Sequence, residues 1–268
     1  MDTALLTGKF TRIGARLKVV DRPASRFNNP DNRLVFDIAS DRRGEYFEIT
    51  RPGGVDPSVE PLDVQPAVQH LLLLVRELDE KSKYLCGMDE RHWFVAAVPE
   101  SAPVGTVRQA WEALKPREVR NAQAVRKVSG KARHRRKNAA FRRQGEWFFL
   151  PVVNMTVPDE LVLHNEPLRR SGGKAHWAQY CYRTGGESVY VCSRYPNGVV
   201  ADQYHKILSG NGRAKNWGWV SMRRNPGVYV CGRIRHPDHA TVNLHGWHQV
   251  IMNTESQSRA MRHVAFLD

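Results

Sequence analysis

The chain has 268 residues, of which 41% are hydrophobic and 9% aromatic, and it carries a formal net charge of +14. This composition excludes a disordered or collagen-like chain and predicts a globular protein of one large or two modest domains. Apolar runs such as residues 71–75 are far too short to cross a bilayer, so no membrane partner is expected. Four widely spaced cysteines without a C-x-x-C pair indicate reduced thiols rather than a zinc ribbon or a disulfide framework, and we therefore expect a cytoplasmic protein.

The first segment, residues 1–103, has the pattern of short strands. Apolar residues cluster or alternate around positions 17–19, 34–38 and 46–49, and Pro, Gly, Asn and Asp separate these stretches. Three further apolar stretches, joined by polar turns, predict a three-stranded meander at residues 70–75, 83–87 and 92–98. We expect the whole segment to be a small antiparallel barrel or sandwich.

The second segment, residues 104–145, is predicted to be a helix followed by a basic strap. Thr106 with Gln109 three residues later is the pattern of a capping box, and an apolar stripe at positions 107, 110, 111 and 114 follows it. Pro116 ends this helix or begins a second one with a weaker stripe. The apolar pattern stops at residues 129–130, where the basic run begins, and a last helical turn is expected at residues 138–143.

The third segment, residues 146–268, is predicted to be a mixed, mostly β domain. Residues 147–150 form an apolar strand, and residues 176–182 and 187–192 alternate around a Thr-Gly-Gly turn, which is typical of a hairpin. A short helix is expected at residues 201–208, and a final hairpin at residues 228–235 and 241–252. The expected fold class is α+β, with an N-terminal antiparallel β domain, a basic helical strap and a C-terminal mixed domain.

The strongest functional signal is the charge of the strap. Between Lys115 and Arg143 there are twelve Lys or Arg residues and a single acid, Glu118, so this stretch carries +11 of the chain's +14. Charge this dense either spreads into solvent as a flexible linker or meets a polyanion, and nucleic acid is favoured over an acidic membrane or protein surface. The strap residues expected to contact a phosphate backbone are Lys131, Arg133, Arg135, Arg136, Lys137, Arg142 and Arg143.

Three further segments join this predicted interface. A pair of glycines at positions 172 and 173 lies between cations and can turn backbone N–H groups toward an anion, although the spacing of a Walker A loop is missing and a plain basic turn is the alternative. A Trp-Gly-Trp sequence near several cations can stack on unpaired bases or belong to a core. With two cations of the final hairpin, the residues assigned to binding here are Arg169, Arg170, Lys174, Trp217, Trp219, Arg233 and Arg235.

The final predicted hairpin concentrates reactive side chains. If its strands alternate regularly, two histidines point to the same inner side and an Asp-His pair forms the tip, while a histidine that begins an earlier strand joins them if the sheets stack. The candidate catalytic residues are His176, His236, Asp238, His239 and His248.

Three interpretations of these histidines remain open. Two imidazoles with a nearby cation can cleave RNA by general acid–base chemistry without a metal. Alternatively, Asp238, His239 and His248 bind a divalent metal. The order Asp238-His239 followed by Asn243-Leu244 resembles the core of HNH nucleases, but with a shorter loop and a strand-like segment in place of the helix of that family. In the third interpretation these are ordinary surface and strand residues.

We expect a nucleic-acid-binding protein that prefers RNA or other single strands, because exposed aromatic rings and a flexible basic strap suit unpaired bases and no helix looks built for a major groove. One alternative is a phosphodiester-processing nuclease that uses the C-terminal histidines. The other is a protein subunit of a larger ribonucleoprotein assembly, with a protein partner. No cofactor is expected, apart from a divalent metal in the nuclease alternative.

Overall fold

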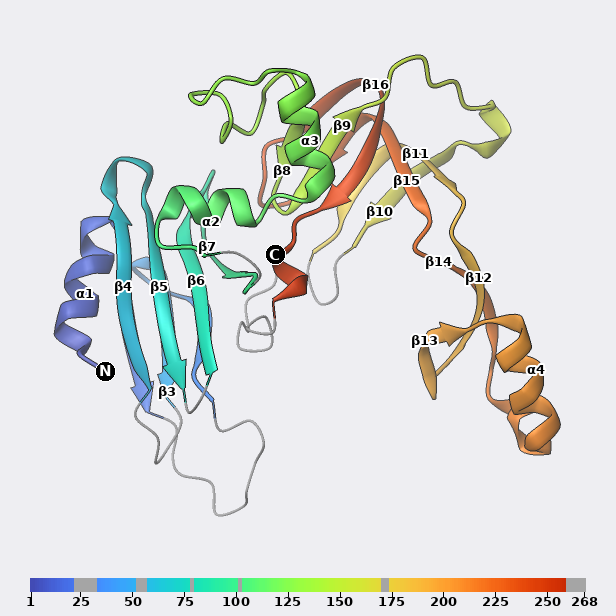
Figure 1. The fold of residues 1–268 in the computed structure, drawn as a ribbon, viewed down its shortest axis with the longest axis horizontal. Helices are drawn as coiled ribbons and strands as arrows, with labels where there is room; N and C mark the ends of the chain where they lie inside the picture. Colours follow the sequence, from blue (N-terminus) through green and yellow to red (C-terminus); the bar gives the residue numbers. More distant parts are fainter. Residues whose placement is uncertain (22–32, 52–56, 78–79, 101–102, 170–173, 259–268) are drawn as a thin grey trace.

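The computed structural model describes residues 1–21, 33–51, 57–77, 80–100, 103–169 and 174–258 (Figure 1). The described part is mostly β-structure, with strands in four sheets and four α-helices. The expectation of a strand-rich chain with a few helices is confirmed at this level. Short 3-10 helices occur at Pro66–Val68, Asp159–Leu161, Gly212–Asn216 and Glu255–Gln257.

The chain begins with a helix, α1 (Thr3–Arg12), which the strand pattern did not predict. Asp2 caps it by accepting a hydrogen bond from the Leu5 N–H at 2.9 Å. Leu6 and Phe10 lie one turn apart on its buried face and enter the first core. An expectation of strands alone was therefore wrong for this region.

Two sheets share that core. A meander runs in the order β4-β5-β6-β7, and a smaller sheet has the order β1-β3-β2. The meander is antiparallel as predicted, but β1 pairs with β3 in parallel, so the expectation of a purely antiparallel domain was wrong. The strands are β1 (Leu17–Asp21), β2 (Val35–Asp41), β3 (Gly44–Arg51), β4 (Ser58–Gln65), β5 (His70–Glu77), β6 (Glu80–Asp89) and β7 (His92–Val98).

Two helices follow, α2 (Val107–Ala113) and α3 (Arg117–Val125). The predicted capping box of α2 is confirmed, since Thr106 and Gln109 bond each other's backbone N–H groups. Beyond α3 the chain makes turns and then enters strand β8 (Arg142–Gln144), so the helical turn expected at residues 138–143 was wrong. These turns are not an open linker, because Phe141 is buried with Val119 and Phe148 in a core of its own.

A six-stranded antiparallel sheet in the order β10-β11-β15-β16-β9-β8 dominates the rest of the chain. The final hairpin, β15 with β16, is confirmed. The core of this sheet lies on one face, where Phe149, Val230 and Ile234 are buried, whereas α3 lies on the opposite face through Phe148. The strands are β9 (Trp147–Pro151), β10 (Leu163–Leu168), β11 (His176–Thr184), β15 (Gly227–Arg235) and β16 (Val242–Met252).

Residues 187–224 form a separate outer module that projects from this sheet (Figure 1). It contains β12 (Glu187–Cys192), β13 (Tyr195–Val199), α4 (Ala201–Gly210) and β14 (Val220–Arg224). The predicted helix α4 is confirmed. The hairpin expected between β11 and β12 was wrong, because β11 pairs with β10 and β15 while β12 pairs with β13 and β14.

The end of the described chain connects the two β regions. Thr254, just after β16, bonds the last turn of α2 through its backbone N–H to Leu114 O at 3.1 Å and its hydroxyl to Ala113 O at 2.7 Å. The Ala240 N–H at the β15–β16 turn donates to Glu90 of the β6–β7 turn at 2.7 Å. None of the helices in the described ranges is both long and apolar enough to cross a membrane.

Candidate nucleic-acid interface and histidine cluster

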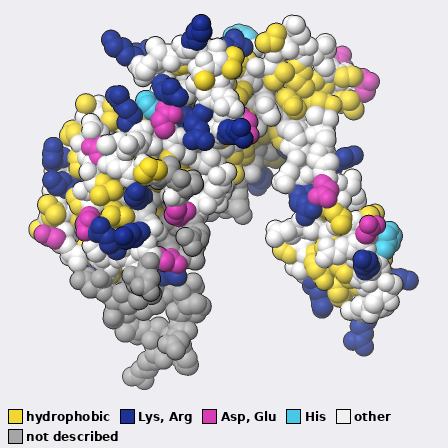
Figure 2. Space-filling view, in the orientation of Figure 1, with side chains coloured by type: hydrophobic (Ala, Val, Ile, Leu, Met, Phe, Trp, Pro, Cys, Tyr) yellow, Lys and Arg dark blue, Asp and Glu magenta, His cyan; other side chains and the backbone are white. Residues whose placement is uncertain are grey.

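The twelve cations of the strap divide into two sets by exposure and pairing. The outward strap cations are exposed, and none of them forms an ion pair with an acid in the described part of the chain. All ion pairs of strap Lys and Arg residues there belong to the second, inward set. The outward set is Arg117, Arg120, Arg126, Lys127, Lys131, Arg135 and Lys137. Figure 2 shows Lys and Arg side chains projecting at the top of the molecule, where α3 and the turns after it lie in Figure 1.

The inward strap cations are Lys115, Arg133, Arg136, Arg142 and Arg143; Arg142 donates to Asn138 O at 3.2 Å, and the other four form ion pairs with acids of the protein. Lys115 is buried, and its Nζ lies 2.7 Å from Glu112 Oε1, which also accepts from Arg133 Nε at 3.0 Å. Burial lowers the pKa of Lys115, and its hydrogen bond to Glu112 opposes that shift. The predicted contacts Arg133, Arg136, Arg142 and Arg143 therefore belong to the frame of the strap, whereas Lys131, Arg135 and Lys137 belong to its exposed surface.

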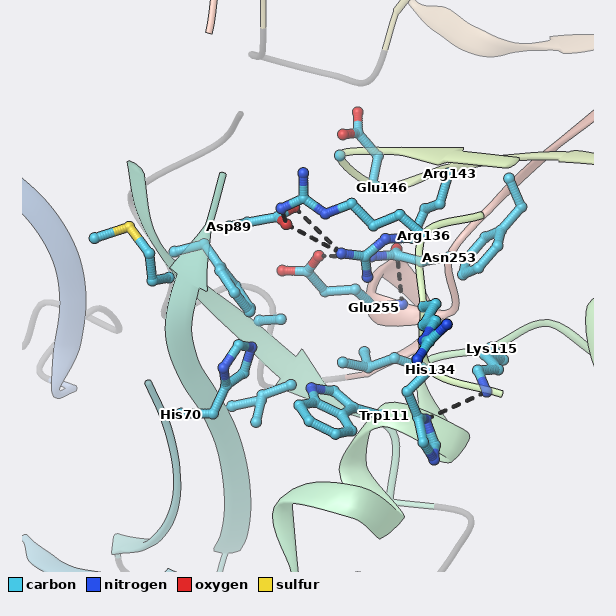
Figure 3. A pocket seen from close by; sticks show the side chains of 18 of the residues that line it. His70, Asp89, Trp111, Lys115, His134, Arg136, Arg143, Glu146, Asn253 and Glu255 are labelled. Atoms are coloured by element: carbon cyan, nitrogen blue, oxygen red, sulfur yellow. Dashed lines mark hydrogen bonds and ion pairs between the residues drawn. The ribbon is translucent and has the colours of Figure 1, made fainter. Parts of the chain in front are cut away.

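Arg136 and Arg143 line a cavity of about 260 Å³ between the meander and the strap. Figure 3 shows them across the cavity from His70 and Trp111. Arg136 pairs with both Asp89 and Glu90, and burial lowers the pKa of each arginine to about 10. Because both arginines already pair with carboxylates, their positive charge is largely neutralised. The side of the cavity opposite them, its floor, is mostly apolar.

His70 forms part of that floor. Its ring packs edge-on against Phe94 and Trp111, with centroids 5.5 and 5.2 Å away, and its Nδ1 lies 2.5 Å from Val68 O. Burial lowers the pKa of His70 to about 4, and Arg143 and Arg136 add to the effect. The imidazole is therefore neutral at neutral pH.

Three of the predicted catalytic residues meet in a histidine cluster, defined as His176, His236 and His239. One nitrogen of each ring lies within 4.8 Å of the corresponding nitrogens of the other two. The rings are stacked, with centroids 4.1 Å apart for His176 and His236 and 4.7 Å apart for His236 and His239. The side chains are 0%, 7% and 5% exposed, in chain order, so the cluster is closed to bulk solvent.

The register of the sheet brings these residues together. Trp177 pairs with Arg235, so His176 at the start of β11 faces His236 just beyond the end of β15, and His239 follows in the turn to β16. Burial lowers the pKa of His176 to about 3 and of His239 to about 4, and it also lowers the pKa of His236. All three rings are therefore neutral at neutral pH.

The other two candidate catalytic residues lie differently. His248 is buried but pairs with Val230, and six residue steps of about 3.3 Å each separate Val230 from His236 along the chain. Asp238 lies at the tip beside the cluster, where Lys174 Nζ binds its carboxylate at 2.7 Å. The HNH-like order is not accompanied by that family's helix, because β16 is a strand. The structure therefore does not bring His248 together with Asp238 and His239.

The remaining predicted binding residues are scattered. Arg169 and Lys174 are exposed, while Arg170 and the two glycines lie outside the described residues. Trp219 packs in the outer module, stacked on Tyr195 with centroids 5.6 Å apart, and its Nε1 donates to Ala214 O at 2.8 Å. Trp217 is half-buried beside it, and Arg194 Cζ lies over the Trp217 ring at 4.4 Å from its centroid.

Arg233 and Arg235 are exposed on β15, on the face of the sheet opposite Ile234. Trp177, which is 39% exposed, lies directly across from Arg235 and was not selected as a binding residue. Asp89, Glu90 and Gly145 were not selected either, although each contacts a predicted site residue. The one available signal was the position of these residues at polar turns between strands.

Comparison with known proteins adds no functional information: no family model, no curated protein and no solved structure matches this chain.

Proposed function

We propose that this chain binds nucleic acid, with RNA or other single strands preferred over duplex, and that the outward strap cations contact the phosphate backbone. The observation that carries this proposal is a surface of seven exposed Lys and Arg residues on α3 and the following turns, none paired with a described acid. A polyanion bound there releases its condensed counterions, which is the main source of sequence-independent affinity for nucleic acids.

The inward strap cations support the proposal because they hold the surface in place. The ion pairs of Glu112 and Asp89, together with the core around Val119 and Phe141, fix the path of the strap. A binding surface that is already ordered loses less conformational entropy when its ligand binds. The strap therefore presents its exposed charges on a frame and does not need to fold around the ligand.

The preference for single strands is supported by the face of the six-stranded sheet on which α3 packs. Trp177, Arg233 and Arg235 lie exposed on this same face, opposite the core of Phe149 and Ile234. An exposed indole between cations can stack on an unpaired base while arginines contact phosphates. α3 itself lies on the sheet through Val119, so it is not presented as a major-groove reading helix.

A matched pair of variants tests the proposal. The strap variant replaces Arg126, Lys127, Lys131, Arg135 and Lys137 with Ala, and the control replaces Arg12, Arg42, Arg43, Lys81 and Arg91, which are exposed cations of the first two sheets and α1. Both variants remove the same amount of positive charge. Fluorescence anisotropy with a labelled single-stranded RNA at several salt concentrations should show weaker binding and a flatter salt dependence for the strap variant, by about 0.7 in log–log slope for each phosphate that is no longer neutralised. Equal behaviour of the two variants would refute the proposal.

The same surface would serve a subunit of a cytoplasmic ribonucleoprotein assembly. That setting adds a protein partner without changing the RNA contact, so the binding experiment tests the contact in either case. The metal-free form of the nuclease alternative is not favoured, because the three clustered histidines are buried and their lowered pKa values leave no protonated imidazole to act as general acid near neutral pH.

A further inference from the structure

The histidine cluster leaves polar atoms unsatisfied in the interior. Both ring nitrogens of His176 and the Nε2 of His236 are buried without a hydrogen-bond partner among the described residues. A buried polar group that makes no hydrogen bond destabilises the fold, because it has lost its hydrogen bonds to water. Stacked neutral imidazoles give back little of that free energy, so packing alone does not account for this arrangement.

Gly145, in the turn between β8 and β9, marks the point toward which two of the rings aim. A Cβ atom at this position would lie 2.9 Å from His239 Nε2 and 3.2 Å from His176 Nε2. The backbone there also has a positive φ of 54°, which glycine adopts without strain. The two Nε2 atoms thus face one small space, which the absence of a side chain at Gly145 keeps open.

Two carboxylates, Glu90 and Asp238, lie beside the cluster. Glu90 Oε2 is 3.8 Å from His239 Nδ1, on the opposite side of the ring from Nε2. Asp238 is close enough for its negative charge to act on the pKa of all three rings, and its backbone N–H donates to His236 Nδ1 at 3.2 Å. A histidine that binds a metal through one nitrogen usually donates its other N–H to a carboxylate or a backbone carbonyl.

We propose that His176, His236 and His239 bind one divalent transition-metal ion of the Zn²⁺ class, with water as the fourth ligand. Three imidazoles with an open fourth position are a ligand set that zinc accepts, and neutral nitrogen ligands suit zinc or cobalt better than magnesium or calcium. At a Zn–N distance of about 2.05 Å, tetrahedral ligand atoms lie about 3.3 Å apart. The nitrogens now lie within 4.8 Å of one another, so binding requires the stacked rings to turn toward the ion.

The site would also stabilise the contact between the two β regions. Its ligands come from the six-stranded sheet, whereas Glu90 comes from the β6–β7 turn and also pairs with Arg136 of the strap. Metal binding would therefore fix the His239 ring. Through its contact with Glu90, this ring would also hold the β6–β7 turn, which pairs with the strap. This role does not depend on nucleic-acid binding.

The test uses the full chain, stripped of metal with a chelator and titrated with Zn²⁺ by calorimetry and with Co²⁺ by visible absorption. We expect one equivalent of each ion and the intense d–d bands of four-coordinate Co²⁺. His236→Gln and His239→Gln should weaken Zn²⁺ binding by at least about tenfold, since loss of an outer partner alone costs about 10–100-fold. The matched control is His248→Gln, because His248 is as buried as His236 and lies on the same hairpin, and it should bind like the wild type.

A second variant covers the case in which the glutamine variants fail to fold. His239→Cys keeps three ligands, and its Co²⁺ complex should show a thiolate-to-cobalt charge-transfer band that the wild type lacks. The proposal is overturned if the wild type binds no Zn²⁺, if His248→Gln weakens binding as much as His236→Gln, or if the cysteine variant gives no such band.

Discussion

Arg143 of the strap binds Asp89 at the end of β6 through both carboxylate oxygens, with Nη2 3.2 Å from Oδ1 and 3.3 Å from Oδ2. The same carboxylate also pairs with Arg136. One acid of the meander thus neutralises two strap cations at the wall of the cavity. This arrangement explains why a segment so rich in positive charge can fold onto the protein.

Replacing Asp89 should therefore destabilise the protein. In Asp89→Asn two half-buried guanidinium groups lose a charged acceptor, and hydrogen bonds to charged groups contribute about 1.5–3 kcal/mol each. We expect urea unfolding to show a loss of about that size. The matched control is Asp21→Asn, whose ion pair with Arg51 is exposed to solvent, and which should leave the free energy of unfolding nearly unchanged. Equal losses in the two variants would contradict the role given to Asp89.

His70 should make stability depend on acid. The pKa of His70 is about 4 in the folded protein against an ordinary value of 6.5, so between these values the unfolded chain binds a proton that the folded chain does not. The free energy of unfolding should fall as pH drops through this window. Arg136, Arg143, Asp89 and His134 are among the ionisable groups that line the same cavity, and His134, whose pKa burial also lowers to about 4, acts in the same direction.

His70→Gln tests this pH dependence. The substitution should reduce the slope of the free energy of unfolding against pH by up to about 1.4 kcal/mol per pH unit between pH 4 and 6.5. Any loss of packing around His70 shifts the whole curve and leaves its slope above pH 7 unchanged. Curves for the wild type and the variant that stay parallel from pH 4 to pH 8 would show that His70 is not the group responsible.

Local patterns predicted those elements whose form is set by neighbouring residues. The capping box at Thr106, the meander and the final hairpin were recognised because each depends on a few adjacent side chains or on a short turn. The error between β11 and β12 has a physical reason. Alternation identifies a strand but not its partner, and here the turn at Gly185 and Gly186 leads from one sheet into another.

The candidate site depended on contacts that are distant in the sequence. His176 meets His236 only because Trp177 pairs with Arg235. The division of the strap into outward and inward cations is also hidden, because Arg135 and Arg136 are chemically identical and differ only in their access to Asp89 and Glu90. The sequence predicted that the strap is basic, but not which of its charges remain free.

Trp219 should stabilise the outer module and not bind bases. It stacks on Tyr195, packs edge-on against Tyr204 and donates to Ala214 O. Because the ring is half-buried, we expect Trp219→Ala to lower the free energy of unfolding by about 3 kcal/mol, the lower end for loss of a packed aromatic ring. The loss should be the same with and without RNA. Thermal unfolding with and without RNA measures this loss. A loss of stability seen only with RNA would contradict the prediction and indicate that Trp219 contacts RNA.

Trp177 is the ring that should contact an unpaired base. It is 39% exposed and lies across from Arg235, on the sheet face that α3 shares. Trp177→Ala should weaken binding of single-stranded RNA by about 1–3 kcal/mol and change the free energy of unfolding little, since the ring is exposed. Binding of duplex RNA should change less, because a paired base offers no open face and contact is then through phosphates. Anisotropy titrations with both RNAs give the comparison. An equal loss of affinity for single-stranded and duplex RNA would indicate that Trp177 only positions nearby arginines. No loss of affinity for either RNA would indicate that the strap alone forms the interface.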